Sequence, residues 1–211
     1  MQRSLSVLLR FLDIRILYAV MALVIPFYML FAHKGYISIY HFYRQGFGYN
    51  PLKSFFYVYA NHFKFGQVIL DRFSFYAGNR FNLDIDGMPL WDELNNREEG
   101  FVQLASHLGN YELAGYSLKS QNKMFYALVY SGETETVMRN RSASFDGNNI
   151  EMIPVADDLS HMIRMSTALS EGHIVSISAD RIFGSPRSVT CSFLGKDARF
   201  PLGPFAIAVQ K

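Results

Sequence analysis

The fold is decided by one stretch of the chain, Phe101-Val102-Gln103-Leu104-Ala105-Ser106-His107-Leu108-Gly109-Asn110-Tyr111-Glu112-Leu113. Its first five residues form a short apolar run, which is typical of a buried strand. Gly109 and Asn110 supply turn and helix-cap residues, and residues 111–120 have the composition of a helix. The pattern therefore predicts that His107 lies on a strand-to-helix connection, where open α/β sheets place ligands and catalytic groups.

Strands and helices alternate on both sides of this stretch. Further strands are predicted at residues 81–86, 124–129, 150–154 and 174–179, and helices at 89–95, 133–143 and 158–171. Alternation at this spacing indicates an α/β fold, with a mostly parallel sheet flanked by helices. Residues 189–193 and 198–200 are expected to form a hairpin around Gly195-Lys196-Asp197.

His107 precedes the carboxylate of Glu112 by five positions. A carboxylate bonded to one imidazole nitrogen fixes the tautomer and stabilises the imidazolium, and a side chain in the first helical turn can fold back toward the residues before it. The pair predicts a general base that deprotonates a substrate hydroxyl or amine, because the motif offers no evident serine or cysteine nucleophile. A loop histidine and a solvated helix glutamate would give the same spacing, so spacing alone leaves both interpretations open.

The string His107-Leu108-Gly109-Asn110-Tyr111-Glu112 resembles the signature of the lipid A biosynthesis (late) acyltransferase family, which is lysophospholipid acyltransferase-like. That signature has a histidine and an acidic residue with four other residues between them, and it commonly contains Gly-Asn-Trp/Tyr-Glu. The order of Asp180, the segment 192–195 and the segment 200–204 is similar to three later elements of the family: an aspartate at a strand end, Phe-Phe-Gly and Thr-Gly-Pro.

Two departures from the family pattern leave the particular acceptor open. Arg181 stands where the family often has glutamine, and Leu202 stands where threonine is common. In the family the chain continues beyond the Gly-Pro element, so we expect this sequence to be truncated at its C-terminus.

The resemblance implies a membrane-associated acyltransferase that needs no cofactor. It would move a fatty acyl chain from a thioester of acyl carrier protein to a hydroxyl or amine of a lipid, such as a lipid A precursor. The enzyme would work at the bacterial inner membrane, with its catalytic domain on the cytoplasmic face. Two alternatives stay open: a noncatalytic membrane-binding protein of the same fold, and a lipid hydrolase.

The resemblance also implies the site residues. His107 and Glu112 would be catalytic, and the substrate-binding candidates are Gly109, Asn110, Arg139, Arg141, Asp180 and Arg181. The amides around Gly109 and Asn110, or the Arg181 side chain, would stabilise the oxyanion. The arginines of residues 133–143 would contact a phosphate of the acceptor or of the carrier protein's phosphopantetheine arm, unless they only form a solvated helix face.

The N-terminal part of the chain is basic and aromatic. Residues 1–80 contain 9 Lys/Arg, 2 Asp/Glu and 20 of the 33 aromatic residues, whereas residues 81–211 contain 11 Lys/Arg and 16 Asp/Glu. The apolar run 16–32, interrupted only by Pro26, would be about 26 Å long as a helix, near the lower limit for a hydrocarbon core about 30 Å thick. We expect an anchor that barely spans the membrane or lies tilted in one leaflet, with a monotopic or re-entrant arrangement favoured.

Other functions of this N-terminal part are disfavoured. A nucleic acid binding segment does not require such an apolar run. A cleaved signal peptide is disfavoured by Asp13 and Arg15 before the run and by the lack of a small-x-small site after it. The expected organisation is an anchor at residues 1–34 and an acyltransferase domain at 35–211. That domain comprises an aromatic helical part (35–80) and an α/β part (81–211).

The sequence predicts no metal site. The single cysteine, Cys191, is expected to be a small buried residue of a strand, and the histidines outside the motif show no ligand spacing. Asp84 and Asp86 alternate with apolar residues before Gly87, which favours two solvent-facing carboxylates on an edge strand over a metal-binding pair.

Overall fold

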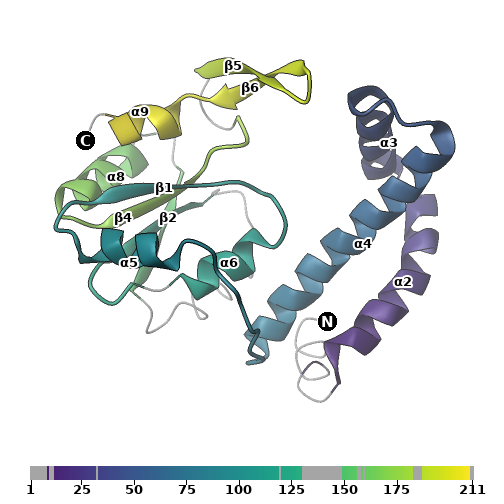
Figure 1. The fold of residues 1–211 in the computed structure, drawn as a ribbon, viewed down its shortest axis with the longest axis horizontal. Helices are drawn as coiled ribbons and strands as arrows, with labels where there is room; N and C mark the ends of the chain where they lie inside the picture. The colour runs from purple at the N-terminus through teal and green to yellow at the C-terminus, as the bar shows by residue number, and fades with distance from the viewer. Residues whose placement is uncertain are drawn as a thin grey trace. The chain divides into compact units, whose positions relative to one another are not determined.

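The computed structural model describes residues 9, 12–31, 33–118, 120–129, 149–155, 158, 160–182 and 187–209, and of residues 33, 112, 116 and 117 only the backbone. These residues divide into two compact units (Figure 1). One comprises Met1–Phe81 and Ser192–Lys196, and the other comprises Asn82–Cys191 and Asp197–Lys211. We call them the helical unit and the α/β unit.

The α/β unit is built on a four-stranded parallel sheet. Its strands are β1 (Phe101–Ala105), β2 (Phe125–Val129), β3 (Ile150–Pro154) and β4 (Ile174–Ser178), in the spatial order β1-β4-β2-β3. In the register of β1 and β4, Ala105 lies opposite Ser178, so both strands end at the same edge of the sheet. The predicted α/β class with a parallel sheet is confirmed.

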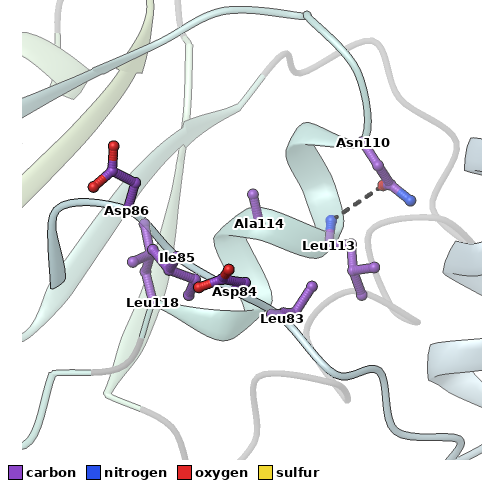
Figure 2. A pocket seen from close by; sticks show the side chains of 8 residues that line it. All are labelled: Leu83, Asp84, Ile85, Asp86, Asn110, Leu113, Ala114 and Leu118. Atoms are coloured by element: carbon purple, nitrogen blue, oxygen red, sulfur yellow. Dashed lines mark hydrogen bonds between the residues drawn. The ribbon is translucent and has the colours of Figure 1, made fainter.

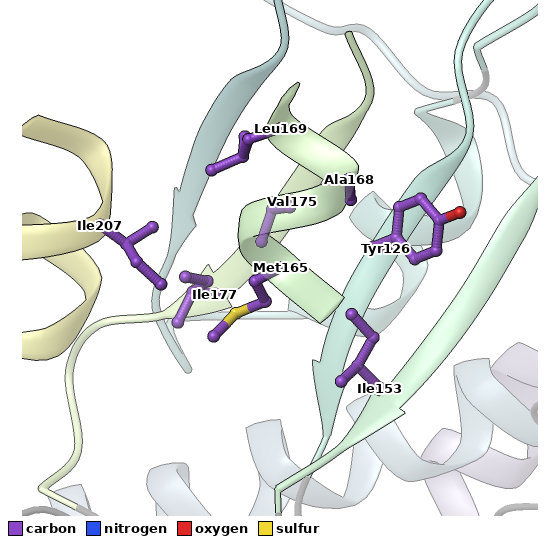
Figure 3. Close-up of a cluster of buried hydrophobic side chains, with 8 residues drawn as sticks. All are labelled: Tyr126, Ile153, Met165, Ala168, Leu169, Val175, Ile177 and Ile207. Carbon is purple, nitrogen blue, oxygen red and sulfur yellow. The ribbon is translucent and has the colours of Figure 1, made fainter. Parts of the chain in front are cut away.

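Helices cover the two faces of this sheet. They are α5 (Met88–Asn96), α6 (Tyr111–Ser117), α8 (Ser160–Ser170) and α9 (Gly203–Val209). Because neighbouring strand residues point to opposite faces, Val175 packs with residues of α8 and α9, whereas Ile174 packs with Trp91 of α5. Figure 3 shows the larger cluster, which comprises Tyr126, Ile153, Met165, Ala168, Leu169, Val175, Ile177 and Ile207.

Several predicted elements are confirmed with small differences. β1 and β3 have the predicted bounds, and α5, β2, β4 and α8 differ from prediction by one or two residues at an end. The predicted helix over residues 133–143 lies outside the described residues.

The predicted strand at residues 81–86 is wrong. These residues are irregular and pair with no strand in the described part of the chain. Leu83 and Ile85 instead line a pocket together with residues of α6, so the alternation of apolar and polar residues does not mark a strand. Gly87 does end the segment as expected, and its φ of 85° suits the turn into α5.

The predicted hairpin is present as β5 (Ser188–Phe193) and β6 (Lys196–Pro201), which form a separate two-stranded sheet. Its turn contains Leu194 and Gly195, both at positive φ. Cys191 lies on β5 as expected but is exposed, so its predicted burial is wrong. Almost all of β5 is exposed, because a two-stranded ribbon buries little of either face.

The end of the sheet opposite His107 is held by a buried lysine. Lys123 is 5% exposed, and its Nζ donates to the carbonyl oxygens of Glu98, Glu99 and Gly172 at 3.4, 2.9 and 2.5 Å. Gly172 itself has a φ of 82°, and a Cβ there would collide with the carbonyl of Glu98. One ammonium group therefore satisfies backbone carbonyls from two connections that precede β1 and β4.

Replacement of Lys123 by methionine is expected to lower the free energy of unfolding by about 2–4 kcal/mol. Methionine keeps an apolar stem but donates no hydrogen bond, so buried carbonyls lose their partner. Chemical denaturation of the full chain measures the change. Arg97→Met is the matched control, because Arg97 pairs with Glu93 on an exposed helix face and should change stability by at most about 0.5 kcal/mol. Equal losses of stability in the two variants would contradict the role of Lys123 as the partner of these carbonyls.

The helical unit is an antiparallel pair of helices joined at one end. α2 (Ile14–Phe31) is followed by α3 (His33–His41), the π-helix η1 (Phe42–Gly46) and the long helix α4 (Pro51–Tyr76). Tyr59 donates a hydrogen bond to the carbonyl of Ala22 at 3.1 Å, and the Tyr18 hydroxyl bonds to Asp71. The earlier residue of α2 thus contacts the later residue of α4, as expected for antiparallel helices.

The predicted apolar run forms a single helix, with Pro26 inside it. α2 is long and apolar enough to cross a membrane by its length and composition. Its buried residues, Ile25 and Met29, pack on Val58 of α4. Most of its other large apolar side chains are exposed, among them Leu23, Phe27 and Phe31.

Candidate functional site

His107 and Asp180 meet at the edge where β1 and β4 end. Each residue lies two positions beyond the last residue of its strand, and the two strands are parallel neighbours in register. The Nδ1 atom of His107 is 2.8 Å from Oδ1 of Asp180. The backbone amide of His107 also donates to Oδ2 of Asp180 at 2.8 Å. One carboxylate therefore fixes both the ring and the main chain of the histidine.

Asp180 is held in its ionised form. Partial burial, the largest single effect, raises the pKa of Asp180, but the hydrogen bonds from the ring and amide of His107, with the charge of that ring, together bring the pKa below its ordinary value. An ionised carboxylate only accepts hydrogen bonds, so neutral His107 carries its proton on Nδ1. Its Nε2 atom then has the lone pair of a base.

Tyr111 packs against the ring of His107. The two ring centroids are 4.7 Å apart, with an angle of 68° between the planes. Tyr111 begins α6, which is capped by the side-chain oxygen of Asn110 accepting from the amide of Leu113 at 3.3 Å. Gly109, at a φ of 62°, makes the turn between His107 and this cap. The glycine and asparagine of the motif thus direct α6 so that its first ring contacts the histidine.

A pocket of about 340 Å³ lies beside α6 (Figure 2). It is lined by Leu83, Asp84, Ile85, Asp86, Asn110, Leu113, Ala114 and Leu118. The lining is mainly aliphatic, and the carboxylates of Asp84 and Asp86 are exposed to solvent as the sequence predicted. Asn110 therefore both caps α6 and lines this pocket.

The family profile described as bacterial lipid A biosynthesis acyltransferase matches residues 76–211, which is more than half of the chain. The chain belongs to this family. Membership supports a membrane-associated acyltransferase, with an acyl donor and a lipid acceptor as its substrates. The suspected resemblance is thereby confirmed. Among curated proteins, none matches the chain significantly.

The predicted site residues of this lipid A family acyltransferase fall into three groups. His107, Gly109, Asn110 and Asp180 come together at the edge of the sheet, and Arg181 is exposed directly after Asp180. Glu112 lies in the first turn of α6, but its side chain is outside the described part of the structure. Arg139 and Arg141 lie outside the described residues.

The partnership of His107 and Asp180 is not predicted by the sequence pattern. The pattern favours Asp180 as a substrate-binding residue and Glu112, the nearest acid along the chain, as the residue that orients the histidine. The available signal was the matching position of the two residues, each shortly after an apolar strand. Using that signal requires knowing that β4 is the neighbour of β1, although β2 and β3 come between them in sequence.

The contact also predicts a dependence of stability on pH. Because the pKa of folded Asp180 is below its ordinary value of about 3.9, the carboxylate stabilises the fold above that pH and loses its contribution as pH falls through the lowered pKa. We expect the stability difference between the native chain and Asp180→Asn to shrink as the pH falls below about 4. Denaturation curves measured from about pH 4 to about pH 3 check this. A difference that grows over that range would contradict it.

Proposed function

We propose that this acyltransferase moves a fatty acyl chain from a thioester of acyl carrier protein to a hydroxyl or amine of a membrane lipid, with His107 as the general base. The observation that carries the proposal is the contact of His107 with Asp180. To act as a base, the imidazole needs a lone pair on one nitrogen and a proton held on the other. A carboxylate that accepts a hydrogen bond from Nδ1 holds the proton there and leaves the lone pair on Nε2.

The reaction follows from this arrangement. Nε2 of His107 takes the proton of the acceptor hydroxyl or amine as the acceptor atom attacks the thioester carbonyl. The tetrahedral intermediate then collapses, the carbon-sulfur bond breaks, and the imidazolium returns the proton to the leaving thiolate. Asp180 stabilises the imidazolium between these steps.

Three further roles complete the proposal. The amides at Gly109 and Asn110 are candidate donors to the oxyanion, with exposed Arg181 as the alternative. Glu112 remains a catalytic candidate from its place in the first turn of α6, although Asp180 takes the orienting role in our proposal. Arg139 and Arg141 remain candidates for contacts to a phosphate.

If acyl carrier protein is the donor, the cellular location of the catalytic unit follows. Acyl carrier protein is acidic, so basic residues following Asp180, namely Arg181, Arg187, Lys196 and Arg199, would steer its approach. The carrier is cytoplasmic, which assigns the catalytic unit to the cytoplasmic face of the bacterial inner membrane. Lipid A precursors, amino-acid lipids and other amphiphiles with a hydroxyl or amine fit the chemistry of the acceptor.

Transfer is tested with the full chain in lipid nanodiscs, a labelled acyl carrier protein thioester and a bacterial lipid extract. We expect labelled lipid to form only when the thioester is present. Release of fatty acid from labelled lipid in the absence of a thioester would indicate the hydrolase alternative. Lipid binding without any product would favour the noncatalytic one. Mass spectrometry of lipids from cells with and without the gene would then identify the acceptor by a shift of one acyl chain.

A further inference from the structure

A long part of the helical unit contains no acidic residue. Residues 14–70 carry five Lys/Arg and no Asp/Glu, and they include α2, α3, η1 and most of α4. The large apolar side chains exposed on these helices include Leu23, Phe27, Phe31, Phe55 and Phe56. An apolar surface of this extent marks an interaction site, and its cations favour a partner that is apolar and negatively charged.

Four aromatic rings pack together where the chain turns into α4. We call Tyr43, Phe47, Tyr49 and Tyr57 the ring cluster. Their centroids lie 5.0–6.2 Å apart in five pairs. The π-helix η1 contributes to this packing, because its wider turn brings Phe42 within 5.4 Å of Phe47, five positions along.

Two cations lie on the ring cluster. Nζ of Lys53 is 3.8 Å from the ring centroid of Tyr49, and the guanidinium of Arg44 donates to the carbonyl oxygen of Tyr49. Both side chains are exposed, and neither forms an ion pair with a carboxylate in the described part of the chain. Rings and a carbonyl orient a cation without cancelling its charge, so both positive charges are available to an anion.

We propose that the ring cluster, with Arg44 and Lys53, binds the phosphates of anionic lipid headgroups at the membrane surface. The rings suit the interface between water and acyl chains, where tyrosine and basic side chains are enriched. Exposed Phe42, Leu52 and Phe55 extend the apolar surface beside the cluster. This continuity favours a bilayer over an acidic protein, whose docking would not need a row of exposed phenylalanines.

The test is the selectivity of the full chain for spin-labelled phosphatidylglycerol over phosphatidylcholine, measured by electron paramagnetic resonance after reconstitution into phosphatidylcholine bilayers. We expect the native chain to prefer phosphatidylglycerol by about fivefold and the Arg44→Gln/Lys53→Gln variant to show a ratio near one. Tyr49→Leu should lower the ratio by about twofold, because it removes the ring that orients Lys53. High salt should weaken the preference.

Lys64→Gln is the matched control, because Lys64 is exposed on the same helix outside the ring cluster. It should leave most of the preference intact. A loss of half the preference or more in this variant would overturn the proposal, since each cation would then count equally wherever it lies. Equal affinity of the native chain for both lipids would also overturn it, as would binding of acyl carrier protein lost in the Arg44/Lys53 variant without any lipid preference. His107→Ala should retain the preference, so this test is independent of acyl transfer.

Discussion

Replacement of His107 by alanine is expected to lower kcat/KM for acyl transfer by about a thousandfold. Alanine has no group to take the proton from the acceptor, and it frees the Asp180 carboxylate from the contact at 2.8 Å. Initial rates with a labelled acyl thioester, at several concentrations of acceptor, measure the change. Most of the loss should fall on kcat, because the imidazole acts mainly in the transition state.

The control for this variant is His161→Ala, which removes a histidine from α8 and leaves the contact of His107 with Asp180 in place. It should transfer acyl chains at nearly the native rate. Thermal unfolding of both variants separates loss of catalysis from loss of fold. A folded His107→Ala enzyme with native kcat/KM would refute the role of His107 as base.

Asp180→Asn is expected to lower kcat/KM by about a hundredfold to a thousandfold. The substitution keeps the size of the side chain but removes the charge that stabilises the imidazolium, and an amide no longer enforces the proton on Nδ1. The same transfer assay measures the effect. If Asp180 served only to bind the acceptor, the change would appear in KM for the acceptor with kcat preserved.

Asp197→Asn provides the matched control, because Asp197 is an exposed aspartate of β6. It should leave transfer within about twofold, as expected for a surface charge. An Asp180→Asn enzyme as active as Asp197→Asn would contradict the role of Asp180.

Local signals in the sequence were sufficient for much of the fold. The run that forms β1 is short, apolar and followed by turn residues, and the alternation of such runs with helical stretches implies a parallel sheet. The alternation around Asp84 led to a wrong strand prediction. A strand also needs a neighbouring strand to pair with, and the local sequence does not show whether that neighbour exists. The prediction for Cys191 is wrong for another reason: a free cysteine is usually buried, but β5 belongs to a two-stranded ribbon that buries little of either face.

Half of the candidate site was predictable in the same way. The histidine, glycine and asparagine of the motif lie close together in sequence, and their turn and cap geometry follows from residue type. The partner of His107 lies 73 positions away, two residues beyond the strand that pairs with β1. Strand order decides which acid reaches the histidine, and the sequence pattern constrains the strands without ordering them.

The central claim is that Asp180 acts through His107. It is tested most directly by a double-mutant cycle on kcat/KM, with His107→Ala, Asp180→Asn and the two combined. Because a carboxylate that orients a base has nothing to orient once the base is gone, the double variant should be no less active than His107→Ala, within about threefold. If the two losses instead multiply in the double variant, the residues act independently and the account is wrong.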